Sequence, residues 1–306
     1  MKSIKRIGIP RGLLYHRYGD IWKELLKSMG FEVITSPGTT ESIRDIGLSL
    51  SVCDLCMPIK VFLGHVNVLK DSVDAVFIPR YISIEQGAYM CPKFIGLPDM
   101  VRAAIRNIPP VIDPVMNLKT GTIMDFVTEL NKKLHFKTPD KDEQLRILGL
   151  PVKRDYFFGE GKITVVVTGR PYLVFDNIMN KGAIRYINSL GVRAFYFIPD
   201  LFSTEKTMDS LPKWVYWSMG KEVVTSVRSM LDNHDICGII NLVNSACGPD
   251  SFLVELITRS FDLGKKPYMA ITIDEHTSDV GLQTRIEAFM DMTLKRKPLN
   301  AWGGGK

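Results

Sequence analysis

Apolar and polar positions follow one pattern in the first half of the chain and repeat it in the second. The apolar run "IKRIGIP" is followed by a Pro/Arg/Gly turn and by "YGDIWKELLKSMG", where apolar residues recur at three- and four-residue spacing before Gly30. This spacing predicts an amphipathic helix, and glycine is typical of a helix end. The run "FEVITSP" then predicts a second strand.

The second half opens with the apolar run "KITVVVTGRPY" and ends the same pattern with "VRAFYFIP". Between these runs, four apolar residues predict one buried helical face: Met179, Ala183, Ile187 and Leu190. Each half therefore reads strand, arginine-containing turn, helix, glycine, strand, which indicates βαβ units and parallel sheets. Internal duplication and two independent α/β units are equally compatible with this repeat.

Four later runs, "DAVFIP", "PPVID", "CGIINLV" and "PYMAITI", are continuously apolar, as expected for strands covered on both faces. A polar segment with Pro and Gly separates the halves near residues 136–160. The fold class is therefore α/β with two parallel-sheet domains. We expect domains at 1–140 and 161–298, a linker at 141–160, and a tail or cloning scar at 299–306.

Composition narrows the setting. The 306 residues suit two domains of roughly 100 to 200 residues each. No apolar run approaches the roughly 18 to 20 residues that cross a bilayer, so we expect no membrane span. Pro10 and Arg11 interrupt the apolar stretch that a signal peptide would need, so we expect a cytoplasmic protein.

The net charge of +6 is modest and the basic residues are scattered, which disfavours a nucleic-acid partner. The same charge is compatible with an anionic small molecule as ligand. The sequence contains no Walker A motif and no G-x-G-x-x-G after a strand, so no motif supports ATP hydrolysis or dinucleotide binding.

The five cysteines carry the most specific chemistry. Cys91 and Cys247 follow predicted strands, where ligands gather in α/β sheets, and Cys53 and Cys56 follow a predicted helix. Cys237 lies inside a predicted strand and reads as core. In the cytoplasm a disulfide scaffold is disfavoured. The pair in "CDLC" remains compatible with a redox dithiol, a zinc site or an iron–sulfur site.

Five separated motifs resemble a known family: "GIPRGLLYHRYGDIWKELLKSMGFEVITSP", "CMPIKVFLGHV", "FIPRYISIEQGAYMCPKFIGLPDM", "CGPDSF" and "IDEHTSDVGLQTRIEAFMDM". They are similar to acyl-CoA dehydratase activase-related proteins, relatives of the subunits of 2-hydroxyacyl-CoA dehydratases and benzoyl-CoA reductases. The resemblance runs from near the N-terminus to about Met292. It implies two flavodoxin-like (Rossmann-like) domains with a cluster site in the cleft between them.

The resemblance also implies an oxygen-sensitive iron–sulfur cluster, [4Fe-4S] or a larger bridged form, on the matching residues Cys56, Cys91 and Cys247. Cys53 is a fourth candidate by proximity alone. The implied function is a low-potential reductase or dehydratase-like enzyme of anaerobic metabolism, acting on a small molecule such as a CoA thioester. An ATP-dependent activator protein as electron donor and a homodimer are implied partners.

Two other functions stay open. One is a non-catalytic cluster protein that serves as redox sensor, carrier or partner. The other is a structural zinc protein with Cys53, Cys56, Cys91 and Cys247 as ligands.

Other polar residues adjoin these motifs. Glu275 and His276 follow the strand "YMAITI" and are candidate catalytic proton carriers. The alternative is a structural turn in which Thr277 and Ser278 cap the next helix. His65 lies nine residues after Cys56, which is too far along a continuous helix for both side chains to bind the same metal ion. Three basic residues near these motifs are Arg11, Lys60 and Arg170. Each is compatible with two roles, as a charge partner of a bound ligand or as a structural or solvated side chain.

Overall fold

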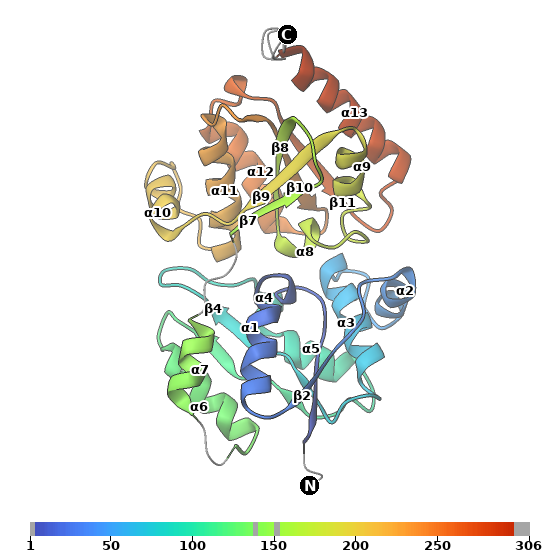
Figure 1. The fold of residues 1–306 in the computed structure, drawn as a ribbon, viewed down its shortest axis with the longest axis vertical. Helices are drawn as coiled ribbons and strands as arrows, with labels where there is room; N and C mark the ends of the chain where they lie inside the picture. The colour runs from blue at the N-terminus through green and yellow to red at the C-terminus, as the bar shows by residue number, and fades with distance from the viewer. Residues whose placement is uncertain (1–3, 137–139, 150–153, 297–306) are drawn as a thin grey trace. The chain divides into compact units, whose positions relative to one another are not determined.

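The computed structural model describes residues 4–136, 140–149 and 154–296. It contains two compact units (Figure 1). Unit 1 comprises Met1–Val152 and the short return segment Val215–Met219, and unit 2 comprises Lys153–Trp214 and Gly220–Lys306. Backbone bonds fasten the return segment within unit 1, because Tyr89 N donates to the Tyr216 carbonyl at 2.7 Å. The expected tail, 299–306, lies outside the described residues.

Unit 1 is built on a four-stranded sheet of order β2-β1-β3-β5, in which every described pairing is parallel. A second, two-stranded parallel sheet pairs β4 with β6. The strands are β1 (Arg6–Ile9), β2 (Glu32–Thr35), β3 (Ala75–Phe77), β4 (Arg80–Ser83), β5 (Val111–Ile112) and β6 (Val115–Asn117). β3 is buried at all three positions, as its continuous apolar run predicts.

The helices of unit 1 join and cover these strands (Figure 1). They are α1 (Tyr15–Ser28), α2 (Glu41–Ser49), α3 (Met57–Leu69), α4 (Pro92–Ile95), α5 (Leu97–Ala104), α6 (Ile123–Lys133) and α7 (Lys141–Leu148). α1 buries Trp22, Leu25 and Leu26, which the helical spacing of apolar residues predicts. α7 lies in the segment that we expected to be a linker, and it packs against α1 and α6.

Unit 2 contains a five-stranded sheet of order β11-β10-β8-β9-β7. The first four strands are parallel, and β7 pairs antiparallel with β9 at the edge. The strands are β7 (Asp155–Phe158), β8 (Ile163–Gly169), β9 (Val192–Phe197), β10 (Ile236–Asn244) and β11 (Tyr268–Ile273). Every residue of β8 and β10 is buried, so these two central strands form the middle of the core.

The helices of unit 2 are α8 (Pro171–Val174), α9 (Ala183–Ser189), α10 (Leu201–Asp209), α11 (Ser218–Leu231), α12 (Gly248–Ser260) and α13 (Asp279–Arg296), with a 3-10 turn, η1 (Leu263–Lys265). α9 is shorter than the apolar spacing predicts. It begins only after Gly182, whose φ of 73° is left-handed, and Leu190 beyond its end is 40% exposed. The predicted single helical face over 179–190 is therefore wrong at both ends, because Met179 precedes the helix and Leu190 follows it.

The chain is an α/β protein with parallel sheets, and both larger sheets change winding direction beside their first long strand. In unit 1 this switch lies between β1 and β3, and in unit 2 it lies between β8 and β10. Open α/β sheets bind ligands at the carboxyl ends of strands beside such a switch. In unit 2, Arg170 and Cys247 follow these strands.

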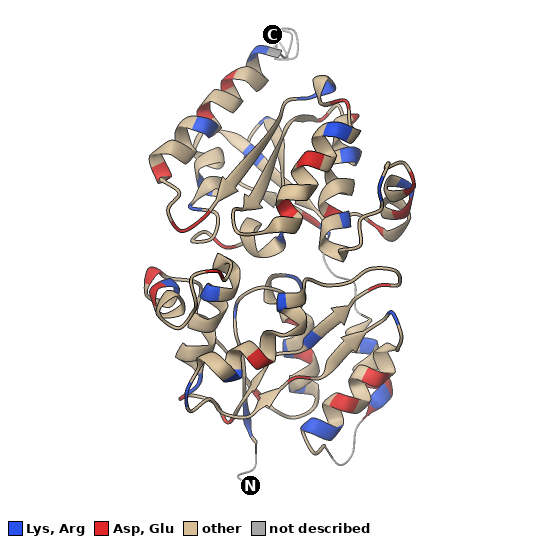
Figure 2. Cartoon of the chain, turned by 180° about the vertical axis from the view of Figure 1, so that it is seen from behind, with Lys and Arg blue, Asp and Glu red and all other residues tan. Residues whose placement is uncertain are grey.

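Basic and acidic residues are interspersed over the helices of both units (Figure 2). No helix among the described residues is long and apolar enough to cross a membrane.

Candidate functional site

Three of the candidate cysteine ligands share one local geometry, which the spacing of the cysteines in the sequence did not predict. Cys56 is the N-cap of α3, Cys91 of α4 and Cys247 of α12. All three are half-buried. Each helix has a proline in its first turn: Pro58, Pro92 and Pro249. Proline suits this place because it lacks an N–H where helical partners are missing. The N-termini of α3 and α12 also favour a negatively charged sulfur.

Unit 1 brings Cys56 and Cys91 into one electrostatic environment. Burial raises the pKa of the Cys56 thiol, Lys93 opposes the rise through its charge and a hydrogen bond, and negative charge on Cys91 reinforces it. Two thiols and one ammonium therefore meet where α3 and α4 begin. Sequence reasoning missed Lys93, although a cation in "CPKF", two residues after a candidate ligand, was a usable signal.

Glycines fix the position of α3 against α2. A Cβ added at Gly64 would lie 2.0 Å from the Ile43 carbonyl oxygen, and one at Gly47 would lie 2.0 Å from that of Lys60. The two helices therefore touch backbone to backbone, which only glycine allows. This contact sets the height at which Cys56 begins α3.

His65 ties α3 to the loop that follows β2. The ring is fully buried, with Nδ1 2.9 Å from Ser36 Oγ and Nε2 2.9 Å from Thr39 Oγ1. Burial lowers the pKa of His65 to about 3, and the nearby charges of His16 and Arg11 add to the effect. Hydroxyls suit a neutral ring because each can donate or accept. His65 is therefore a structural anchor of α3.

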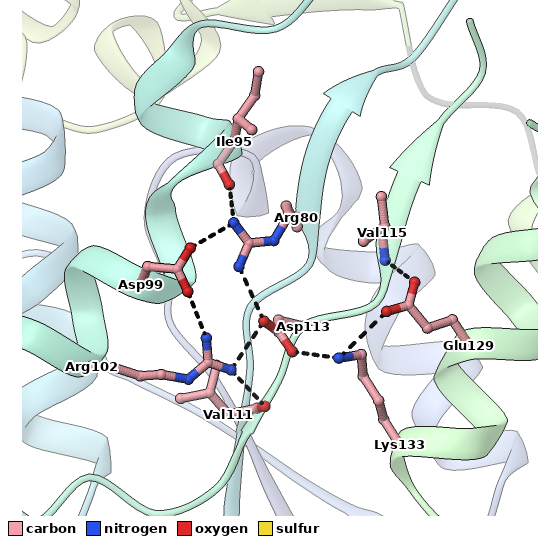
Figure 3. Close-up of polar contacts among 9 residues, drawn as sticks. All are labelled: Arg80, Ile95, Asp99, Arg102, Val111, Asp113, Val115, Glu129 and Lys133. Atoms are coloured by element: carbon pink, nitrogen blue, oxygen red, sulfur yellow. Dashed lines mark hydrogen bonds and ion pairs between the residues drawn. The ribbon is translucent and has the colours of Figure 1, made fainter. Parts of the chain in front are cut away.

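An ionic network anchors α4, the helix of Cys91 (Figure 3). Arg80 Nη1, from β4, donates to the carbonyl of Ile95 at 2.6 Å and to Asp99 Oδ2 at 2.7 Å. Ile95 is the last residue of α4, so Arg80 connects this helix to the strand before it. Sequence reasoning did not single out Arg80.

Asp113 is the buried centre of the same network. Its side chain is 8% exposed and lies 2.8 Å from Lys133 Nζ, 3.0 Å from Arg102 Nη2 and 3.4 Å from Arg80 Nη2. Burial raises the pKa of Asp113, but Lys133 and Arg102 outweigh it and leave the pKa lowered. Glu129 closes the network by accepting from Val115 N and pairing with Lys133 (Figure 3).

Unit 2 anchors Cys247 differently. Arg170 follows β8, and its Nε and Nη2 donate to Asp250 Oδ1 at 2.8 and 2.5 Å. Both side chains are 7% exposed. Burial raises the pKa of the Cys247 thiol to about 12; the Asp250 charge adds to the rise, and the backbone N–H of Asp250 and the Arg170 charge oppose it. Of the two uses considered for Arg170, the structure shows the salt bridge.

Three further sequence candidates lie in different settings. Cys53 is exposed in the turn before α3. Cys237 is buried in β10, as the core reading predicts. Lys60 is 4% exposed within α3, so it is not a solvated side chain.

Glu275 and His276 lie in a turn between β11 and α13. Asp274 organises this turn, because its Oδ1 accepts from His276 N and from Thr277 Oγ1, both at 2.9 Å. The Thr277 hydroxyl is the main cause of the lowered pKa of Asp274. Ser278 Oγ accepts from Gly281 N at 3.4 Å at the start of α13. The contacts of this turn are those of the capping alternative, in which Thr277 and Ser278 have structural roles.

Neither unit by itself provides all the thiols that a thiolate-bound metal or cluster needs. No group of three or more His, Cys, Asp or Glu side chains is placed to hold a metal ion within the described parts of the chain. Unit 1 contributes two half-buried thiols next to a cation, and unit 2 contributes one thiol with the same cap geometry. Half-buried thiols at proline-containing helix starts suit iron–sulfur ligation.

Two family matches cover most of the chain. Residues 6–199 match the CoA enzyme activase uncharacterised domain (DUF2229), and residues 116–293 match the 2-hydroxyglutaryl-CoA dehydratase, D-component. The chain belongs to both families. This confirms the resemblance that the five sequence motifs carry.

Comparisons with curated sequences and with solved structures give no further functional information. No curated protein sequence matches the chain. A structure of 2-oxoglutarate:ferredoxin oxidoreductase from Magnetococcus marinus, with 2-oxoglutarate, coenzyme A and succinyl-CoA bound, matches at 10% identity and a TM-score of 0.24. The match covers 94% of this chain and 62% of that chain.

Proposed function

We propose that this relative of the 2-hydroxyacyl-CoA dehydratase components is an iron–sulfur protein that acts as a low-potential reductase or dehydratase-like enzyme. Its ligands are Cys56, Cys91 and Cys247. The observation that carries the proposal is that Cys91 and Lys93, from one segment of the sequence, lie close enough to Cys56, from another, to shift the pKa of its thiol. Membership of the dehydratase D-component family supports the same chemistry.

The residues of the chain have distinct parts in this proposal. The three thiols bind iron as thiolates, so binding releases their protons. Lys93 offsets negative charge beside Cys56. A bound iron–sulfur cluster supplies one-electron chemistry at a potential that its protein surroundings set. Cys53, exposed and three residues before Cys56, is the candidate for a fourth thiolate.

The deciding experiment is quantitation of iron, acid-labile sulfide and zinc, with an absorption spectrum, after anaerobic purification. We expect a brown protein that loses iron in Cys56→Ser, Cys91→Ser and Cys247→Ser. Cys237→Ala is the matched control, because this thiol is buried in β10 and is not a proposed ligand. The Cys53→Ser variant tests the fourth position.

Other results would point elsewhere. Zinc without sulfide, bound through all four candidate thiols, would replace the proposal with a structural zinc site. Iron indifferent to Cys91 and Cys247 would contradict the ligand set. A loaded protein without turnover on any CoA thioester, even with a strong reductant, would leave the non-catalytic carrier or sensor as the function.

Substrate, partner and proton carriers belong to the same proposal. A CoA thioester substrate is supported by both family descriptions, which name CoA enzymes. We expect turnover with an ATP-dependent activator, and an unchanged rate without activator and ATP would contradict this. Glu275→Gln and His276→Gln test the proton carriers. Loss of turnover at full iron content would assign that role, and unchanged turnover would leave the two residues as parts of a turn.

A further inference from the structure

The Arg170–Asp250 pair is unusual in using only one carboxylate oxygen. Both donating nitrogens of Arg170 point to Asp250 Oδ1. Asp250 Oδ2 is buried and has no hydrogen-bond partner within the described protein. A buried carboxylate oxygen without a partner is costly, so a second donor is expected beside it.

A small cavity borders the Arg170–Asp250 pair. It is lined by Gly169, Arg170, Asn241, Asp250 and four apolar residues of unit 2. The volume open to the centre of a water molecule is about 10 Å³. This is close to the roughly 10 to 15 Å³ that a single buried water needs, and the lining is polar enough to bind one. The cavity is too small for a substrate or cofactor.

The same pair lies at the start of α12. Asp250 is the third residue of this helix, and Cys247 is its N-cap. Arg170 belongs to the loop after β8, so the pair joins the ends of the two strands at the winding switch of unit 2. Arg170 and Asp250 are 80 residues apart in the sequence. Their contact is therefore a tertiary bond within the first turn of the helix that Cys247 caps.

We propose that Arg170 and Asp250 are positioning residues for Cys247, and that one buried water, bound to Asp250 Oδ2, completes their pair. The pair holds the first turn of α12 in place, so that the Cys247 sulfur is presented in one orientation. The ligand role of Cys247 rests on the proposed function, whereas the positioning of its thiol is testable without any metal.

The test measures how fast iodoacetamide alkylates Cys247 in the full chain after anaerobic treatment with an iron chelator. Peptide mass spectrometry gives the rate at each cysteine, and buried Cys237 reports on global unfolding. The key variant is Arg170→Met. Removing the guanidinium charge raises the thiol pKa and alone would slow alkylation, whereas loss of positioning accelerates it. The two explanations thus predict opposite signs.

We expect Cys247 in Arg170→Met to react on the order of tenfold faster, because removing one partner leaves the other buried and unpaired and opens the turn. Cys56, Cys91 and Cys237 should keep their rates. An unchanged or slower rate at Cys247 would overturn the proposal. The matched control is Arg259→Gln, which removes an exposed pair with Glu255 on the same helix and should leave the rate unchanged.

Two further measurements keep the proposal decidable. If Arg170→Met does not fold, Arg170→Lys keeps the charge but loses the forked donor, and an intermediate acceleration is expected; no acceleration overturns the proposal. A high-resolution crystal structure should show one ordered water within hydrogen-bond distance of Asp250 Oδ2. An empty cavity beside an unpaired oxygen would refute the water.

The outcomes also separate this inference from the proposed function. If the wild-type protein binds no iron, the proposed function fails, and the alkylation rates still decide the positioning role. If iron binds but Arg170→Met changes neither the alkylation rate nor the iron content, only the positioning role fails.

Discussion

The two units anchor their candidate ligand turns by opposite means. In unit 1, α4 is held by a network of three cations and three carboxylates that is partly open to solvent, and α3 is held by glycine contacts and the neutral ring of His65. In unit 2, α12 is held by one buried ion pair. Unit 1 therefore anchors its ligand helices through many contacts, whereas unit 2 anchors α12 through one ion pair.

The difference has energetic consequences. In a network, a carboxylate that loses one cation keeps the others, so a single substitution removes only part of the stabilisation. In an isolated buried pair, removing one member leaves a charge without compensation. We therefore expect unit 2 to be more sensitive to substitution but insensitive to salt, and unit 1 to show the reverse.

The largest expected effect is that of Arg170→Met on folding stability. Loss of one partner from a buried pair typically costs about 3 to 5 kcal/mol. The double variant Arg170→Met/Asp250→Leu should recover much of this loss, because well-packed apolar residues often replace a buried pair at little cost. Urea unfolding of both variants measures the difference. A double variant no more stable than the single one would show that the pair is not the source of the loss.

The next effect concerns pH and the anchor of α3. The pKa of His65 is about 3 in the folded chain and near 6.5 when unfolded, so the unfolded state binds the extra proton between these values. The stability that the neutral ring provides is therefore complete above pH 6.5 and decreases as the pH falls toward 3.

From pH 7 to pH 5 this ring should cost the wild type about 2 kcal/mol of stability. The His65→Gln variant, whose side chain does not titrate, should lack that part of the pH dependence. Urea unfolding of both proteins at the two pH values measures it. Parallel pH dependence in the two proteins would mean that other groups carry it.

The network at α4 should give a smaller effect that depends on salt. Arg80→Gln removes contacts to Asp99, Asp113 and the Ile95 carbonyl, and we expect a loss of about 1 kcal/mol because solvent screens part of the network. In 1 M NaCl the loss should shrink, since screening acts on exposed charges. Unfolding at low and high salt measures both values. A loss for Arg80→Gln as large and salt-independent as that for Arg170→Met would erase the distinction between the units.

Much of the fold was predictable because the long strands are buried on both faces. β8 and β10 are buried at every position and mostly apolar, so their runs stand out in the sequence. The segment 141–160 was read as a linker because α7 is mostly charged and β7 is a half-exposed edge strand. Short polar elements obtain their stability from the rest of the fold, which local patterns do not show.

The candidate site was predictable only in its residue types. The positions of Cys56, Cys91 and Cys247 after helices or strands were visible in the sequence. That Cys56 and Cys91 share one environment was not, because it depends on how α3 and α4 pack. Asp250 was missed for the same reason, since its partner Arg170 lies 80 residues away. An acidic residue three positions after a cysteine in "CGPD" was the available signal.

The smallest effect on folding stability is expected for Gly248→Ala. This variant also tests most directly whether Cys247 of unit 2 binds the proposed iron–sulfur cluster. Gly248 follows Cys247 at the start of α12, and an added Cβ there would meet no atom within 4 Å. Folding stability should therefore change by less than about 0.5 kcal/mol. A bulky group bound to the Cys247 sulfur would meet this methyl group, because glycine lets the backbone approach a ligand closely. We expect reduced iron content at unchanged thermal stability, measured by iron analysis and calorimetry on the same preparation. Lys213→Ala is a control outside the turn. Full iron content in Gly248→Ala would show that the group does not approach this backbone, and a loss of stability would show that the space beside Gly248 is already filled in the folded protein.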